Sequence, residues 1–256
     1  MVQSGLHTPL GRPAVFMMYP LRNLFLLPLV MLCADLSAFA NDLRLPATDI
    51  VIGFVGGMVG HTNAIHSEVQ LAARLREDYP SGVQVRMFEN RHGREARREI
   101  LALLDANHDG GLSEAEKDRA RIIIYGHSWG ASETVTLARA LGRRGIPVLL
   151  TIQVDSVAKP GENDRSIPAN VAQAVNFYQR DGLLHGEPRI YADDSSRTRI
   201  LGNFRFGYKA HPVDCAGYPW YARLFMRPHI EIESDPVVWS RVESLIRLKL
   251  PPAEMR

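Results

Sequence analysis

Ser128 is the residue of this sequence whose surroundings point most directly to chemistry. It lies in Gly126-His-Ser-Trp-Gly130, between an apolar β-branched run at residues 122–125 and sequence of helical character through Leu141. Such a run is typical of a buried strand. Strand, G-x-S-x-G and helix in this order predict a sharp turn that has no room for a Cβ at either glycine and exposes the serine hydroxyl. Because a helix N-terminus stabilises negative charge, this stretch predicts a nucleophilic serine for acyl transfer.

The elements that must position this serine are apolar strands that alternate with helices. Continuous apolar strands in such an alternation predict an α/β fold, a parallel sheet covered by helices on both faces. The predicted strands are residues 49–54, 83–88, 122–125, 147–154 and 189–192. The first three predicted helices are residues 65–79, 94–104 and 131–141. A fourth begins at Pro168 and carries Val171, Ala174, Val175 and Tyr178 on one face, and a final helix is capped by Asp235.

With these elements the chain resembles the α/β-hydrolase superfamily, in its small lipase or esterase form. The resemblance covers nearly all of residues 48–250 and is most specific at residues 126–130. It implies a serine hydrolase that cleaves carboxylic esters through an acyl-enzyme, with its catalytic partners in the chain order Ser, Asp, His.

The resemblance implies an aspartate at a strand end as the acid of the triad. Asp155 follows the strand at residues 147–154, a position that resembles the acid of pancreatic-type lipases. Asp193 and Asp194 follow the strand at residues 189–192 and are the alternative, although such aspartates can also be only turn or cap residues. We expect Asp155 to accept a hydrogen bond from the imidazole and so to fix its tautomer.

The base of the triad is expected downstream of both the serine and the acid. His229 precedes the final helix, as the histidine of the superfamily usually does, and His211 is the rival. We expect His229 to take the proton of Ser128 and to return it to the leaving group.

An oxyanion hole requires two backbone donors. The first expected donor is the amide of Trp129, the residue after the nucleophile. Residues 53–57 resemble the H-G-F-G-G loop of lipases, with Ile52 where the histidine usually stands. The second donor is therefore expected from Phe54, with Val55 as the alternative, unless these glycines serve packing alone.

Residues 105–116 resemble the twelve-residue calcium loop of the EF-hand superfamily, within a helix-loop-helix of residues 94–121 inserted before the strand of the nucleophile. The predicted Ca²⁺ ligands are Asp105, Asn107, Asp109, Gly111 through its carbonyl, Ser113 and Glu116, with Gly110 at the sharp turn. The alternative is a metal-free turn followed by a Ser113–Glu116 capping box. Because the loop is unpaired, we expect a structural ion rather than a regulatory one.

The N-terminus has the features of a secretory signal peptide. Arg22 precedes an apolar run at residues 24–33, and Ala38-Phe-Ala40 is an A-x-A-type cleavage site. We expect a signal peptide over residues 1–40, with Met17 or Met18 as a possible start, and a periplasmic or secreted hydrolase domain over residues 41–256. An uncleaved anchor is the alternative.

Composition narrows the functional classes further. A hydrophobic content of 46% and a charged content of 23% are typical of a soluble globular domain, so no stable membrane insertion is expected after cleavage. A net charge of +2 offers no electrostatic case for nucleic acid. Cleavage would leave Cys215 as the only cysteine, so stability must come from the core or a bound ion.

The sequence leaves two other functions open. One is a non-catalytic, calcium-dependent binding protein on a hydrolase scaffold. The other is an acyltransferase or thioesterase that uses the same triad. A small-molecule or lipid ester is the expected partner of the favoured function.

Overall fold

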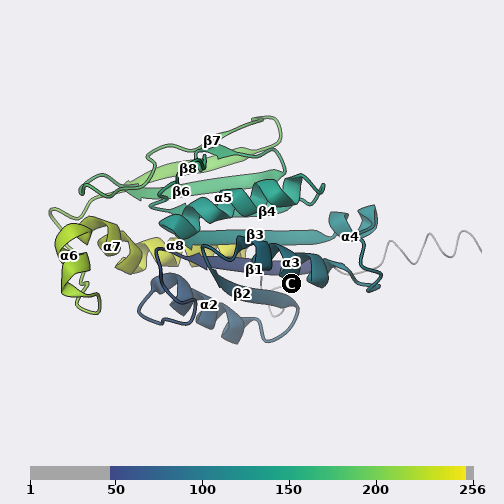
Figure 1. The fold of residues 1–256 in the computed structure, drawn as a ribbon, viewed down its shortest axis with the longest axis horizontal. Coiled ribbons are helices and arrows are strands. Elements are labelled where there is room, and N and C mark those ends of the chain that lie inside the picture. Colours follow the sequence, from purple (N-terminus) through teal and green to yellow (C-terminus); the bar gives the residue numbers. More distant parts are fainter. Residues whose placement is uncertain (1–46, 252–256) are drawn as a thin grey trace, which may run out of the picture. The chain divides into compact units, whose positions relative to one another are not determined.

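A six-stranded parallel sheet, in the order β2-β1-β3-β4-β6-β8, organises the residues that the computed structural model describes, 47–251 (Figure 1). Its strands are β1 Thr48–Val55, β2 Val83–Glu89, β3 Ala120–His127, β4 Val148–Val154, β6 Val171–Gln179 and β8 Arg199–Phe206. Strands β5 Ser166–Ile167 and β7 Tyr191–Ala192 pair in a second, two-stranded sheet. The predicted signal peptide lies outside the described residues.

Helices cover both faces of the large sheet. They are α2 Ser67–Asp78, α3 Gly93–Leu104, α4 Glu114–Asp118, α5 Trp129–Gly142, α6 Trp220–Phe225, α7 Arg227–Ser234 and α8 Pro236–Lys249. Side chains of α2 and α8 pack on the face that carries Ile123 and Tyr125, and those of α3 and α5 pack on the face of Ile122 and Ile124. The apolar run of β3 at residues 122–125 is buried on both faces of the sheet, as expected for a strand covered by two helical layers, and the predicted fold class is confirmed.

The predicted helix after Pro168 is wrong, since this segment is strand β6, between β4 and β8. Its apolar residues fit a helical period, but a short apolar run does not by itself distinguish a buried strand from a helix. The sheet also extends to β8, which the sequence pattern did not predict.

None of the helices in residues 47–251 has both the length and the hydropathy that a membrane span requires.

Candidate active site

Ser128 lies on the sharp turn between β3 and α5. Its φ of 57° and ψ of −125° are strained for a residue with a Cβ. A Cβ on Gly126 would come within 2.6 Å of the Gly130 backbone, and a Cβ on Gly130 within 2.4 Å of the Phe54 carbonyl oxygen. The two glycines therefore allow the strand and the helix to approach closely enough to form the turn, as the sequence predicted.

His229 and Asp155 complete a hydrogen-bonded chain that begins at Ser128. The Ser128 hydroxyl lies 2.9 Å from His229 Nε2, and His229 Nδ1 lies 2.6 Å from Asp155 Oδ2. His229 belongs to α7, and Asp155 follows β4 directly. In this network Nδ1 donates to the carboxylate and Nε2 accepts from the hydroxyl, which is the tautomer that a general base requires.

The Asp155 carboxylate is fully buried and held by several donors. Besides His229, it accepts from the Gln179 amide at 3.1 Å, the Gln179 side chain at 2.8 Å and the Gly186 amide at 2.8 Å. Burial acts to raise the pKa of Asp155, but the hydrogen bond and charge of His229 and the donors of Gln179 together lower it below its usual value. The carboxylate is thus kept ionised and fixed in orientation.

The alternative acid and base residues lie elsewhere. Asp193 accepts from the Ser166 hydroxyl beside the small sheet, and Asp194 binds the amide and hydroxyl of Ser196. His211 is exposed. The structure thus brings together the three residues that the sequence analysis favoured.

The predicted role of Phe54 in the oxyanion hole requires correction. Phe54 is fully buried within β1, where it pairs with Phe88 and Gly126, and it does not line the cavity at Ser128. The alternative, Val55, also remains in β1. The chain leaves the sheet only after these residues, and Gly57 and Met58 of the following loop line the cavity, so their amides are candidates for the second donor.

The first predicted donor is the amide of Trp129. Trp129 is the first residue of α5 and lines the cavity. The first amides of a helix have no acceptor within the helix. The Trp129 amide can therefore point toward the oxygen of a bound carbonyl, together with an amide of Gly57 or Met58.

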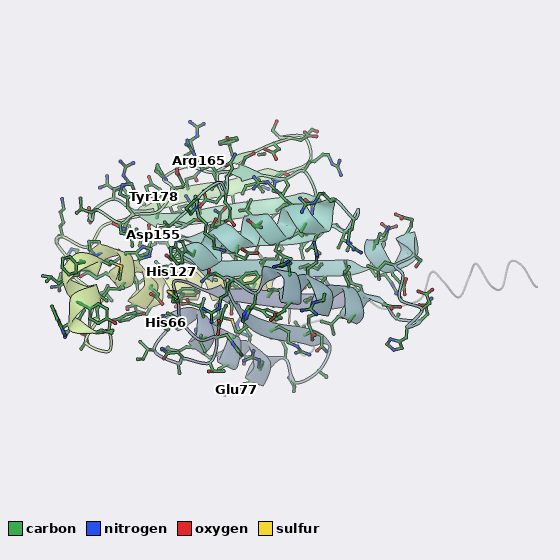
Figure 2. All side chains as sticks on the ribbon, viewed as in Figure 1. His66, Glu77, His127, Asp155, Arg165 and Tyr178 are labelled. Atoms are coloured by element: carbon green, nitrogen blue, oxygen red, sulfur yellow. The ribbon has the colours of Figure 1, made fainter. Side chains whose placement is uncertain are left out.

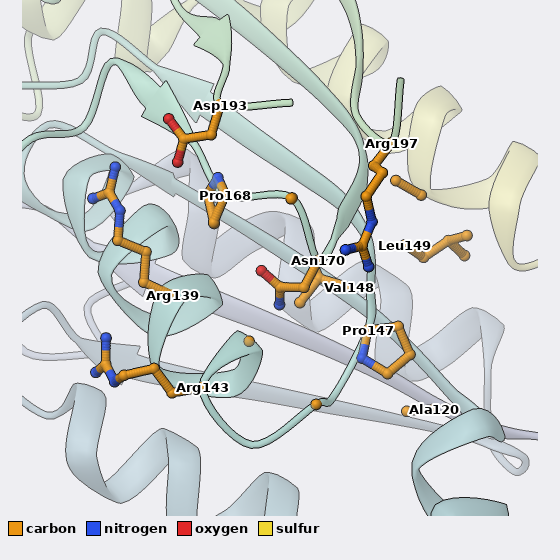
Figure 3. A pocket seen from close by; sticks show the side chains of 14 residues that line it. Ala120, Arg139, Arg143, Pro147, Val148, Leu149, Pro168, Asn170, Asp193 and Arg197 are labelled. Atoms are coloured by element: carbon orange, nitrogen blue, oxygen red, sulfur yellow. The ribbon is translucent and has the colours of Figure 1, made fainter. Parts of the chain in front are cut away.

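The cavity at Ser128 has a volume of about 560 Å³ and a largely apolar wall. Its apolar lining includes Met58, Ile65, Val157, Leu184, Tyr221, Met226 and Ile230. A larger cavity of about 760 Å³, shown in Figure 3, is lined by Arg139, Arg143, Asn170 and Arg197 at the ends where β4 and β6 begin. Ligands of open parallel sheets bind at the carboxyl ends of strands, which favours the cavity at Ser128.

A second polar cluster lies beside Ser128 and includes His66, Glu68, His127 and Glu233, all buried. The rings of His127 and His229 are 4.5 Å apart, and His127 Nε2 is 3.2 Å from the His229 carbonyl oxygen. Burial lowers the pKa of His127 to about 4, so this imidazole is neutral at pH 7. Sequence reasoning missed this cluster because its members come from three distant segments and share no motif.

The predicted calcium loop joins α3 to α4 and is held by its own amides. Asp105 accepts from the amides of Asp109 at 3.2 Å and Gly110 at 3.0 Å, and Asp109 accepts from the Gly111 amide at 2.7 Å. Glu116 accepts from the Ala106 amide at 2.9 Å and the Ser113 amide at 2.8 Å, and it forms the capping box of α4 with Ser113.

The oxygen ligands suit Ca²⁺ in kind, but they do not converge tightly. Within residues 47–251, His66, Glu68 and Glu233 are the one set of three His, Cys, Asp or Glu side chains whose ligand atoms all lie within 4.8 Å of one another. The carboxylates of Asp105, Asp109 and Glu116 therefore lie farther apart. Glu116 would have to exchange its amide partners for the ion.

The strand order, the strained serine between β3 and α5 and the Ser-His-Asp chain define an α/β-hydrolase-like fold. No protein family model and no curated protein matches the chain.

Several solved structures are similar. A cutinase-like protein from Cryptococcus sp. is 14% identical, with a TM-score of 0.42 over 80% of this chain and 98% of that one. Human thioesterase 2 is 10% identical, with a TM-score of 0.41 over 81% and 98%. An uncharacterised protein from Pseudomonas aeruginosa is 10% identical, with a TM-score of 0.37 over 70% of this chain, which spans 43% of that protein's length.

Proposed function

We propose that this chain is an exported serine hydrolase that cleaves carboxylic esters with an apolar acyl or alkyl part. The observation that carries the proposal is the imidazole of His229, with one nitrogen 2.9 Å from the Ser128 hydroxyl and the other 2.6 Å from buried Asp155. This arrangement favours catalysis over a purely non-catalytic scaffold, because binding alone does not require a base beside the Ser128 hydroxyl.

The reaction follows from this geometry. Ser128 Oγ attacks the ester carbonyl while His229 Nε2 takes its proton, and the amides of Trp129 and the Gly57–Met58 segment hold the oxyanion. His229 then protonates the leaving alcohol, and an ester of Ser128 remains. Water, deprotonated by the same nitrogen, releases the acid and restores the serine. Asp155 stabilises the imidazolium in both halves.

The apolar wall of the cavity supports an apolar substrate. Exposed side chains of α6 extend this character outside the cavity, since Trp220, Leu224 and Phe225 are 69%, 66% and 72% exposed. Large apolar residues clustered on a surface are typical of sites that meet lipids or other apolar partners.

Hydrolysis of p-nitrophenyl acetate, butyrate, octanoate and laurate tests the proposal. We expect the longer esters to be preferred, and Ser128→Ala to lower kcat by roughly 10⁴–10⁶-fold. Ser240→Ala, at an exposed serine of α8, is the matched control and should retain full activity. Equal activity of the two variants would contradict the proposed nucleophile, and an acyl product on an added alcohol would indicate acyl transfer.

Two further parts of the proposal rest on the sequence. Export through cleavage after Ala40 predicts a mature protein that begins at Asn41, which mass spectrometry of the exported chain would test. A structural Ca²⁺ at residues 105–116 is proposed from the ligand pattern, and the ion would replace the amides of the loop that Asp105 and Asp109 now bind.

A further inference from the structure

We propose that His66, Glu68 and Glu233 form a binding site for a divalent transition metal ion, best represented by Zn²⁺, beside the catalytic serine. The site is separate from the calcium loop, and it does not depend on the esterase proposal. His66 precedes the first turn of α2, Glu68 lies in that turn, and Glu233 lies in α7. Figure 2 labels His66, which directly precedes α2, and His127, the last residue of β3.

The three side chains already converge. Their ligand atoms all lie within 4.8 Å of one another, and each residue is at most 9% exposed. His66 Nδ1 contacts Glu233 Oε1, and His127 Nδ1 lies 3.3 Å from Glu233 Oε2. The Glu233 carboxylate thus lies between two imidazoles, with a second carboxylate beside it.

The buried carboxylate of Glu68 gives an independent indication of a ligand. It is fully buried, and no donor meets either carboxylate oxygen in regular hydrogen-bond geometry, although its own backbone amide, the Gly56 backbone and the Glu233 carboxylate interact with it at longer range. Burial, followed by the charge of Glu233, raises the pKa of Glu68 well above its usual value. A buried polar group without a partner is costly, so native structures normally provide one.

A divalent cation would satisfy this cluster. It would offset the charge of the two carboxylates and give Glu68 a ligand bond. Mixed imidazole and carboxylate ligands are typical of Zn²⁺, whereas Ca²⁺ and Mg²⁺ prefer oxygen alone. His127 Nδ1, 3.3 Å from Glu233 Oε2, could supply a fourth ligand.

The surroundings also suit a bound ion. His66 and Glu233 line the cavity at Ser128, which provides an entry path from solvent. Trp239 Nε1 donates to the Glu233 carbonyl oxygen at 2.5 Å, and the Tyr218 ring packs edge-on against His66 at 5.5 Å. Such outer contacts fix ligand orientation.

Titration of chelator-treated protein with Zn²⁺ in the presence of excess Ca²⁺, monitored by calorimetry, tests the site. We expect one Zn²⁺ per chain in the unaltered protein, and Glu68→Gln to weaken its binding by at least about 100-fold. Glu77→Gln, at an exposed position of the same helix, is the matched control and should bind Zn²⁺ like the unaltered protein. Zn²⁺ should also raise the Tm of the unaltered protein and leave that of Glu68→Gln unchanged.

Co²⁺ provides a measurement on the unaltered protein that does not depend on a variant folding. Bound at this site, Co²⁺ should show the intense visible absorption of four-coordinate geometry. Equal Zn²⁺ binding by Glu68→Gln and the unaltered protein would overturn the proposal in favour of surface histidines. Weak, six-coordinate Co²⁺ absorption and no stoichiometric Zn²⁺ would overturn it in favour of a proton shared by Glu68 and Glu233.

Discussion

Asp155 and Glu116 are two carboxylates held in opposite ways. The donors to Asp155 come from Gln179, Gly186 and His229, which are 24, 31 and 74 residues away. The donors to Glu116 come from Ala106 and Ser113, which are 10 and 3 residues away. The carboxylate at the candidate active site therefore depends on the whole fold, whereas the one in the loop depends on a single turn of chain.

This difference has a functional consequence. A carboxylate buried by distant elements is fixed in orientation and can hold an imidazole in one tautomer. A carboxylate held by amides of its own loop, beside exposed residues 106–111, can exchange those amides for an ion. The fold thus positions the proposed catalytic acid, and the local sequence forms the proposed calcium ligand set.

The largest expected effect is on catalysis. Asp155→Asn should lower kcat on a soluble ester on the order of 10³-fold, because an amide at this position favours the wrong tautomer of His229. Asp109→Asn, the same change in the loop, should leave kcat in saturating calcium within about twofold of the unaltered value. Steady-state kinetics of both variants check the comparison, and an equal loss of activity would show that the two regions are coupled.

The next effect is on stability. Gly130→Ala places a Cβ within 2.4 Å of the Phe54 carbonyl oxygen, so it should lower the free energy of unfolding by about 2–4 kcal/mol. In Gly111→Ala the nearest neighbour is the flexible Asp109 side chain at 3.2 Å, and the expected loss is below about 1 kcal/mol. Urea unfolding measures both values, and similar losses would mean that the close contact of β1 and α5 is not retained in solution.

Calcium should act on the loop alone. In ~10 mM Ca²⁺, a weak structural site would stabilise the protein by about 1–3 kcal/mol. Asp105→Asn should abolish the rise in Tm, whereas Asp118→Asn, at an exposed residue of α4 outside the ligand positions, should retain it. A Tm that responds to neither Ca²⁺ nor chelator would remove the structural ion from the account.

The smallest effect concerns pH. In the folded chain the pKa of Asp155 lies below its usual value of 3.8. At a pH between the folded pKa and the usual one, the unfolded chain therefore binds more protons than the folded chain. The contribution of Asp155 to stability is therefore present above about pH 4 and is lost as the pH falls through its folded pKa. The difference in unfolding free energy between the unaltered protein and Asp155→Asn should shrink below about pH 4. A constant difference would contradict the lowered pKa.

The parts of the molecule that could be predicted from the sequence are those fixed by neighbours along the chain. The strand, glycines and helix around Ser128 follow from one local turn. Asp155 was favoured because it follows a predicted strand, and His229 because it precedes the final helix. The resemblance supplied the chain order Ser, Asp, His, and the structure brings both residues to Ser128. The capping box of α4 was equally local, and it was foreseen as the alternative to calcium.

What could not be predicted depends on pairing across the sheet or between distant segments. Strand β6 carries apolar residues at helical spacing, and its pairing with β4 and β8 overrides that pattern. Phe54 was predicted to end its strand and was also expected to donate its amide because residues 53–57 resemble a lipase loop, but β1 continues through Val55. The convergence of Glu68 and Glu233, which are far apart in the sequence, required the packing of α2 against α7.

The most direct test of the account is covalent labelling of the folded protein with a fluorophosphonate, followed by peptide mass spectrometry. We expect one adduct, on Ser128, with labelling strongly slowed in His229→Gln and absent in Ser128→Ala. Absence of labelling in the unaltered, folded protein, or an adduct on another serine, would contradict a primed nucleophile at this turn.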